Sequence, residues 1–296
     1  MNFNRIPLIA GLAAIAAVAT ADYTTQVIVQ NLPAPTGIAV RGQGPNTTIY
    51  WTEVPNPGVP MMHNAVRKMN LHSGVQTLLH MGEPDPQNIA LDQFGNAYWT
   101  CRSAGVILRQ SADGMTTGPI LENLLRPTGI SVDLHGNIYF TQVPTPGVPG
   151  SMGGMNTTNM FDGTTIHTLT FGEPEPTDIV VDRQGTAYWT CKSAGVILKR
   201  TRRGDVSLVL DNLNEPTGIA LDKTQRHLVF TEVPTPGVPG SMGGLNAVWT
   251  YDLKRDSLTL VAGGDPQPTD VAVGMNGHIF WTCTSAGVIV EAIPNR

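Results

Sequence analysis

The chain's three cysteines occupy the same point of a phrase that occurs three times. Cys101, Cys191 and Cys283 stand in YWTCRSAGVIL, YWTCKSAGVIL and FWTCTSAGVIV. Three thiolates could bind one zinc ion if their sulfur atoms converged to about 2.3 Å from it. A catalytic thiol fits less well, because a nucleophile needs one activated copy and the sequence supplies three alike. We favour a third interpretation, in which the cysteines are small residues packed where one strand turns into the next.

Two further sets of polar residues recur, and each consists of two carboxylates and one amide. The first set follows the second strand of alternate repeat units and comprises Glu53, Gln142 and Glu232. The second set lies at the start of the first strand in the units between them and comprises Asn88, Asp178 and Asp270. Carboxylate and amide oxygens are ligands for hard cations. The same residues could instead cap turns or pair along a channel wall, and the sequence leaves both interpretations open.

Apolar and cationic side chains gather near the same strand ends. Three long loops rich in Pro and Gly carry Met61, Met62, Met152, Met155 and Met242. Thioethers adapt to irregular apolar ligands. Equivalent positions of the second strands hold Trp51, Trp99, Trp189 and Trp281, which would add aromatic surface or pack between repeats. The candidate catalytic residues are Arg102 and Lys192, which follow two of the cysteines, and His63. His63 lies in the one long loop that lacks the sequence SMGG found in the other two.

The repeats that position these residues predict an all-β fold. The cysteines are 90 and 92 residues apart, so a double repeat contains two units of about 45 residues each. Units of this length with several short strands are typical of β-propeller blades, and three double repeats predict six blades with pseudo-threefold symmetry. The segment 24–37 aligns with 205–218, which predicts that an N-terminal outer strand closes the last blade and protects both edges.

The N-terminus and the composition bear on location and partners. Residues 1–21 contain Arg5, an apolar run and the ending Ala-Thr-Ala, which predicts a signal peptide and a secreted or secretory-pathway propeller over 22–296. Asn46 and Asn156 lie in glycosylation sequons. A net charge of −5 with dispersed Lys and Arg argues against nucleic acid as a partner, and the absence of a second apolar run argues against a membrane partner. The oligomeric state is left open.

The repeated phrases resemble those of a known group of propellers. Pro-x-Gly-Ile strands followed by Gly-x-Ile-Tyr-φ-Thr strands are similar to those of the NHL and regucalcin/gluconolactonase/strictosidine synthase group. Regucalcin-type lactonases use a Glu, Asn and Asp set from different blades, so the resemblance implies a metal-dependent hydrolase as one alternative. The residue types are supplied by Glu53, Asn88, Asp178, Glu232 and Asp270, and a divalent cation in the central channel would then be expected.

The chain as a whole resembles small secreted fungal propellers that act as hetero-Diels-Alderases on tropolonic sesquiterpenoids. The resemblance rests on the combination of a signal peptide, the double repeat, strands that begin with PTG(I/D), and loops that contain Pro, Gly and Met. This resemblance implies cycloaddition of a tropolone-type o-quinone methide to an apolar alkene such as humulene, with no cofactor. Positioning and hydrogen bonding to a carbonyl oxygen would supply the catalysis. Arg102 or Lys192 would donate, and His63 or an acid would assist dehydration. A non-catalytic, lectin-like propeller with three equivalent pockets is the remaining alternative.

Overall fold

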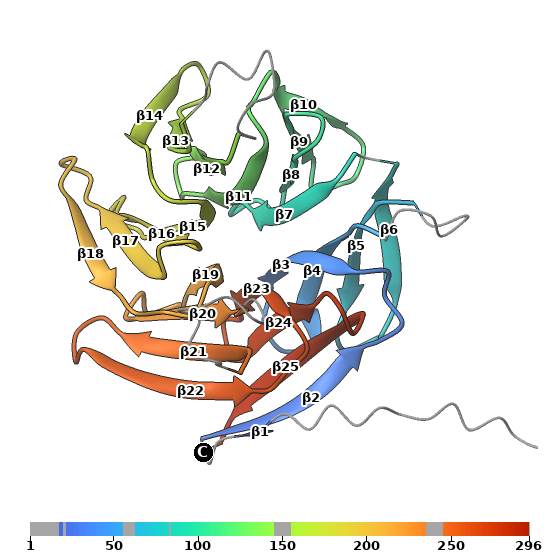
Figure 1. Ribbon diagram of the computed structural model, residues 1–296. Helices are drawn as coiled ribbons and strands as arrows, with labels where there is room; N and C mark the ends of the chain where they lie inside the picture. The colour runs from blue at the N-terminus through green and yellow to red at the C-terminus, as the bar shows by residue number, and fades with distance from the viewer. Residues whose placement is uncertain are drawn as a thin grey trace, which may run out of the picture.

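Six small antiparallel sheets form a ring around a central axis (Figure 1). The computed structural model describes residues 18–19, 22–55, 63–82, 84–144, 155–234 and 245–295. Each sheet is one blade, and its innermost strand is followed along the chain by strands progressively farther from the axis, apart from the strands that the start of the chain adds at the outer edges of two blades. The predicted six-bladed β-propeller is therefore confirmed, as is the alternation of two kinds of blade.

The blades are named A to F in the order of their innermost strands. Blade A contains β3 (Pro35–Arg41), β4 (Thr48–Glu53), β5 (Ala65–Asn70) and β6 (Gln76–Met81), with a short 3-10 helix at Gly44–Asn46. Blade B contains β7 (Pro86–Leu91), β8 (Ala97–Cys101), β9 (Val106–Gln110) and β10 (Thr117–Leu121). Blade C contains β11 (Pro127–Val132), β12 (Ile138–Gln142), β13 (Thr157–Phe161) and β14 (Ile166–Phe171).

The second half of the ring repeats this order. Blade D contains β15 (Pro176–Val181), β16 (Ala187–Cys191), β17 (Val196–Arg200) and β18 (Val206–Leu210). Blade E contains β19 (Pro216–Leu221), β20 (His227–Glu232), β21 (Ala247–Asp252) and β22 (Ser257–Gly263). Blade F contains β23 (Pro268–Val273), β24 (Ile279–Cys283), β25 (Val288–Pro294) and, from the N-terminus, β2 (Tyr23–Val29).

The ring closes as the repeat alignment predicts. β2 pairs with β25 in antiparallel register, with Tyr23 opposite Pro294 and Val27 opposite Val290 (Figure 1). The last blade thus takes its outer strand from the start of the chain. A further two-residue strand, β1 (Val18–Ala19), pairs with β22. Cleavage before Asp22 would remove β1 and leave β22 as the outer strand of blade E.

The core lies between neighbouring blades. One aromatic ring per blade stands at the same point of the second strand, and all six are fully buried: Trp51, Trp99, Phe140, Trp189, Phe230 and Trp281. A buried threonine follows each of them, and several of these hydroxyls bond to the next blade. Thr100 donates to the carbonyl oxygen of Thr128 at 2.6 Å, and Thr190 donates to that of Thr217 at 2.7 Å. Neighbouring blades are therefore joined by apolar packing and by directional bonds.

No helix among the described residues is long and apolar enough to cross a membrane.

Candidate site at the mouth of the propeller

The loops that enter the first strands and leave the second strands share one face of the ring, which we call the mouth. In every blade the residue before the first-strand proline has a positive φ, between 46° and 59°: Ala34, Asp85, Arg126, Glu175, Glu215 and Gln267. Residues before proline normally adopt extended conformations, so this geometry carries strain. In each case the carbonyl oxygen accepts the N–H of the residue just beyond the second strand, at 3.0 to 3.3 Å. These bonds fix six equivalent loops at the mouth.

Arg102 and Lys192 lie at the mouth as the sequence predicts, and each pairs with a carboxylate. The Arg102 Nε is 3.4 Å from Asp85 Oδ2, and the Lys192 Nζ is 3.5 Å from Glu215 Oε2. Both cationic side chains keep about a third of their surface exposed, at 37% and 32%. The distances are long for hydrogen bonds, so the ion pairs orient the cations while leaving N–H groups able to donate to another acceptor.

Sequence reasoning missed the carboxylates of these pairs. Asp85 and Glu215 are the positive-φ residues described above, which stand directly before a strand's first proline. The available signal was an acidic residue in the phrases PDP and NEP, directly before the innermost strands.

The cysteines pack in the core, as the favoured interpretation holds. All three are fully buried and form no disulfide. Burial, and then the nearby Glu173 carboxyl, raises the pKa of the Cys191 thiol to about 12, and burial and Asp265 raise the pKa of Cys283 in the same direction. Among the described residues, no group of three or more His, Cys, Asp or Glu side chains could hold a metal ion. The thiols of Cys191 and Cys283 therefore stay protonated, and the described residues do not bring the three cysteines together as a zinc site.

The four tryptophans are also core residues. Trp51, Trp99, Trp189 and Trp281 have no exposed surface. Trp189 packs with Ile179 and Cys191, and Trp281 packs with Val271 and Cys283. Trp99, Trp189 and Trp281 thus pack between blades, and the prediction that their rings line a ligand pocket is wrong. A pocket lined by their rings would require the second strands to separate from their neighbours.

Glu53, Gln142 and Glu232 hold parts of the fold together. Glu232 accepts the backbone N–H of Asn214 and the indole N–H of Trp249, both at 2.7 Å. Gln142 accepts the equivalent backbone N–H, that of Leu125, at 2.6 Å. In blade A the corresponding residue is Pro33, which has no N–H.

The Glu53 carboxylate accepts hydrogen bonds from other groups, because Pro33 has no backbone N–H to donate. It accepts from Trp51 Nε1 at 2.8 Å and from Arg67 Nε at 3.0 Å. The side chains of Glu53, Gln142 and Glu232 therefore form hydrogen bonds and ion pairs within their own blade or with the loop before it. Glu53 is fully buried.

Asn88, Asp178 and Asp270 meet across the axis. Asn88 Nδ2 donates to Asp178 Oδ1 at 2.8 Å, and the Asp178 and Asp270 carboxyls are hydrogen-bonded to each other. Asp178 also accepts the N–H of Ile219 from the next blade, and Asp270 accepts that of Ile38. All three side chains are buried and lie in the wall of an axial cavity of about 300 Å³ that the innermost strands line.

The carboxyl pair at the axis shares a proton. Burial raises the pKa of both groups, to about 7 for Asp270, and the charge of Asp270 raises that of Asp178 further. Two carboxylates in contact cannot both ionise at ordinary cost. A divalent cation would need both to be ionised and would need an oxygen of Asn88, which instead points its Nδ2 at the pair. The residues as arranged do not fit the cation expected of a regucalcin-type site.

The glycines opposite this set explain the two kinds of blade. A Cβ added to Gly37, Gly129 or Gly218 would lie 2.5 to 2.6 Å from the Cα of Asn88, Asp178 or Asp270 respectively. That approach is too close for any side chain. Blades A, C and E, which we call the long-loop blades because they contain the three loops rich in Pro and Gly, must therefore have glycine where the following blade has its polar residue.

Exposed apolar side chains stand on the mouth face of the long-loop blades. Met155 and Phe171 are 62% and 71% exposed, and Met81 and Leu245 occupy similar strand ends in blades A and E. His63 is exposed at the point where its loop joins β5. The predicted ligand-contacting residues Met61, Met62, Met152 and Met242 lie outside the described residues. Their role and that of His63 stay predictions.

The two sequons differ in their surroundings. Asn46 is exposed at the end of the 3-10 helix. Asn156 is half-buried, and its Nδ2, the atom that would carry a glycan, donates to the carbonyl oxygen of Glu173 at 2.8 Å. Asn246 makes the equivalent bond in blade E. The structural role shared with Asn246 thus accounts for the asparagine at position 156. The geometry favours Asn46 as the residue that would carry a glycan.

Comparison with known proteins places this fold among propellers of several activities. No family model matches the chain. A curated protein from Pyricularia oryzae, named low-density lipoprotein receptor-related protein 1, is 29% identical over 220 residues, which cover 64% of this chain and 68% of that protein.

Solved structures resemble it more extensively. A streptogramin B lyase has a TM-score of 0.61 at 16% identity, covering 93% of this chain and 98% of its own. The calcium-binding protein regucalcin from Agrobacterium tumefaciens has a TM-score of 0.66 at 13% identity, covering 91% and 93%. Virginiamycin B lyase from Staphylococcus aureus has a TM-score of 0.57 at 17% identity, covering 93% and 88%. The chain is thus a six-bladed propeller with neighbours of the lyase, gluconolactonase and regucalcin types. At these identities the likeness concerns the fold alone.

Proposed function

We propose that the protein is a hetero-Diels-Alderase, which binds a tropolone-type o-quinone methide and an apolar sesquiterpene alkene such as humulene at the mouth. Catalysis rests on holding the diene and the alkene in a reactive geometry. Arg102 or Lys192 donates a hydrogen bond to the carbonyl oxygen as electron density accumulates there. The new C–C and C–O bonds form from the π electrons of the two partners, so no protein atom is consumed.

The observation that carries this proposal is the chemical character of the groups left available at the mouth. The cysteines are buried, the thiol pKa values of Cys191 and Cys283 are raised, and Glu53 and Glu232 are committed to bonds within the fold. The partly exposed cations Arg102 and Lys192 remain, oriented by Asp85 and Glu215. Exposed apolar side chains such as Phe171 share that face. Oriented N–H donors on the same face as exposed apolar side chains suit a hydrocarbon substrate with one oxygen to be held.

The secretory pathway remains our proposal for the location of this activity. Its support is the apolar N-terminal segment and the complete burial of the three free cysteines. A buried thiol is protected from exchange in an oxidising compartment.

The test is a cycloaddition assay in which the o-quinone methide is generated in the presence of humulene. Arg102→Ala and Lys192→Ala each remove a donor. We expect the variant that loses the active donor to lose roughly 100-fold in kcat, the size typical of removing one oxyanion-type donor. Arg109→Ala is the matched control, because Arg109 contacts Tyr98 on the far side of blade B and should retain the wild-type rate.

Two results would contradict the proposal. If the wild-type protein changed neither the rate of the cycloaddition nor the stereochemistry of its product, the proposed activity would be rejected. Full activity in the Arg102→Ala/Lys192→Ala double variant would reject the donor assignment.

A further inference from the structure

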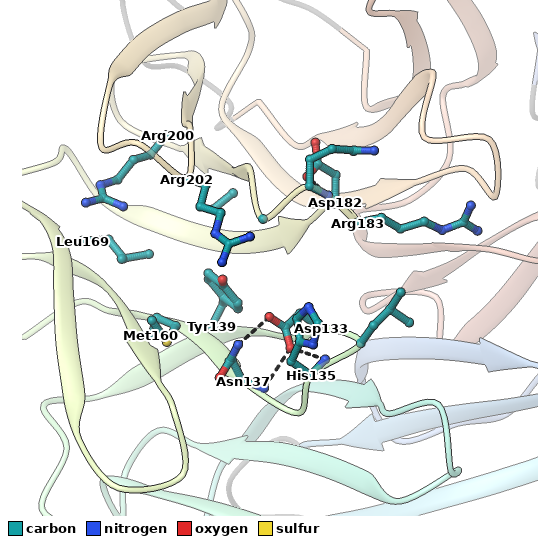
Figure 2. A pocket seen from close by; sticks show the side chains of 14 residues that line it. Asp133, His135, Asn137, Tyr139, Met160, Leu169, Asp182, Arg183, Arg200 and Arg202 are labelled. Atoms are coloured by element: carbon teal, nitrogen blue, oxygen red, sulfur yellow. Dashed lines mark hydrogen bonds between the residues drawn. The ribbon is translucent and has the colours of Figure 1, made fainter.

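A groove between blades C and D, at the end of the propeller opposite the mouth, contains two arginine side chains. It has a volume of about 210 Å³ (Figure 2). Arg200 and Arg202 line it from the β17–β18 hairpin, and Tyr139 lines it from β12. Among the described residues, neither arginine forms a hydrogen bond or an ion pair. Two guanidinium groups that no described residue pairs with, in one groove of a chain with net charge −5, require an explanation.

Tyr139 is an independent sign of a ligand. Its side chain is largely buried, with 7% of the residue exposed, yet within the described part of the chain its hydroxyl has no hydrogen-bond partner. The equivalent tyrosines of the neighbouring blades are satisfied, because Tyr98 donates to Asp92 at 3.1 Å and Tyr188 bonds to Asp182. Burial raises the pKa of Tyr139, so its hydroxyl keeps the proton that it can donate. Figure 2 shows Arg202 extending toward Tyr139 from the opposite wall.

The acidic residues of the groove are committed elsewhere. Asp133 accepts the backbone N–H groups of His135 and Asn137 and the Asn137 side-chain amide. Asp182 accepts the backbone N–H groups of Gln184 and Thr186 in the corresponding turn. Both carboxylates therefore stabilise their own turns and are not paired with the arginines. The apolar side chains of Met160 and Leu169 complete the wall beside Arg200 (Figure 2).

The repeat supplies an internal control for this groove. Arg200 lies opposite Ala187 in blade D, as Gln110 lies opposite Ala97 in blade B. The groove between blades A and B has the equivalent tyrosine, Tyr50, but there the positions of Arg200 and Arg202 hold Gln110 and Ala112. The ring therefore folds with neutral residues at these two positions. The arginines are an addition in one groove and are not needed by the blade.

We propose that the groove between blades C and D binds a small oxyanion, a carboxylate or a phosphate or sulfate group, through Arg200, Arg202 and the Tyr139 hydroxyl. Guanidinium groups donate two parallel hydrogen bonds to such groups, and the hydroxyl adds a third direction. Met160 and Leu169 accommodate a short apolar part of the same molecule. This site is separate from the mouth and does not depend on the activity proposed there.

Isothermal titration with inorganic phosphate, sulfate and benzoate tests the site, at about 10 mM ionic strength where screening is weak. Wild-type protein should bind at least one of the three at a saturable site. The double variant Arg200→Gln/Arg202→Ala, which installs the blade B residues, should weaken that binding at least about tenfold, since each charge-assisted hydrogen bond contributes roughly 1.5–3 kcal/mol. Tyr139→Phe should weaken it about tenfold for the same reason.

Arg183→Ala is the matched control. Arg183 lines the edge of the same groove, but its Nη2 donates to the carbonyl oxygen of Lys223 in blade E, so the affinity should stay within about twofold of wild type. Binding of benzoate alone would identify a carboxylate ligand, and binding of phosphate or sulfate would identify a tetrahedral one. No saturable binding of any probe, or equal binding by the double variant, would overturn the proposal. Thermal unfolding of each variant confirms that the ring is intact.

Discussion

At the residue scale, a few contacts explain why particular amino acids recur while others vary. Glu232 and Gln142 accept a backbone N–H that Pro33 cannot offer to Glu53, so Glu53 bonds to Trp51 and Arg67 instead. The sequence shows that an acidic residue recurs at this position, but it does not show which N–H group donates a hydrogen bond to it. The placement of Arg102 at the mouth could be predicted, because it follows a strand end whose position the repeat fixes.

A close contact between the backbones of two blades gives a residue-scale prediction. Gly129→Ala would place a Cβ 2.5 Å from the Asp178 Cα, where only backbone movement relieves the clash. We expect the free energy of unfolding to fall by about 3 kcal/mol or more, at the upper end of overpacking effects. Chemical denaturation followed by tryptophan fluorescence measures this.

Gly118→Ala is the control for that substitution. Gly118 lies in β10, and its added Cβ would have nothing within 4 Å. Its stability should stay within about 0.5 kcal/mol of wild type. Equal stability of the two variants would show that blades C and D pack less tightly than described.

At the element scale, the strands follow from the repeat, whereas the contacts between blades do not. The phrase lengths and turn residues predict four strands per blade and the pairing of β2 with β25, which the structure confirms. The burial of Trp189 could not be settled, because a strand residue faces either a neighbouring blade or a pocket depending on how the blades pack. The unpaired arginines were missed for the same reason, although the run KRTRR at 199–203 was the available signal.

The closing strand gives an element-scale prediction. Deletion of residues 1–29 removes β2 and exposes the edge of β25, including a run of buried residues from Val288 to Ala292. We expect this chain to aggregate or to unfold at least 10 °C lower, because an open edge strand pairs with other chains and blade F loses a quarter of its sheet. Thermal unfolding and light scattering provide the measurement.

Deletion of residues 1–21 is the comparison for that experiment. It removes the predicted signal peptide and β1 but keeps β2. This shorter chain should remain a monodisperse, cooperatively folding protein. Similar behaviour of the two deletions would mean that blade F is stable without its N-terminal strand.

At the scale of the whole molecule, the axial carboxyl pair connects most of the ring. Asp178 and Asp270 bond to residues of blades B, E and A as well as to each other. Sequence spacing predicted that these residues form a ring, since equivalent positions face a common axis. It could not predict a shared proton, because that depends on the distance across the channel and on the exclusion of water.

This pair makes stability depend on pH. The pKa of Asp270 is raised by burial to about 7 in the folded protein, above its value of about 3.8 in the unfolded chain. A carboxyl with a raised pKa stabilises the fold fully below the unfolded pKa, and this contribution is lost as pH rises from about 4 through 7. For Asp270 alone this loss is at most about 4 kcal/mol, which corresponds to about three pKa units.

Asp270→Asn removes one of the two titrating carboxyl groups and the charge that raises the pKa of Asp178, and Asn88 shows that an amide fits an equivalent position. We therefore expect the free energy of unfolding of the variant to fall less than that of the wild type between pH 5 and 8. Denaturant titrations across that range give both slopes. Parallel curves for the two proteins would show that the pair does not hold a proton near neutrality.

The alternation of crowded and empty positions around the axis also limits how such a molecule can arise by gene duplication. Gly37, Gly129 and Gly218 each tolerate a neighbour only because their own side chain is absent. Insertion of one blade would set two like blades together at a seam, either with two bulky groups in conflict or with two glycines beside a void. Duplication of a pair of blades preserves this alternation, whereas gain or loss of a single blade would also require a substitution at the new seam.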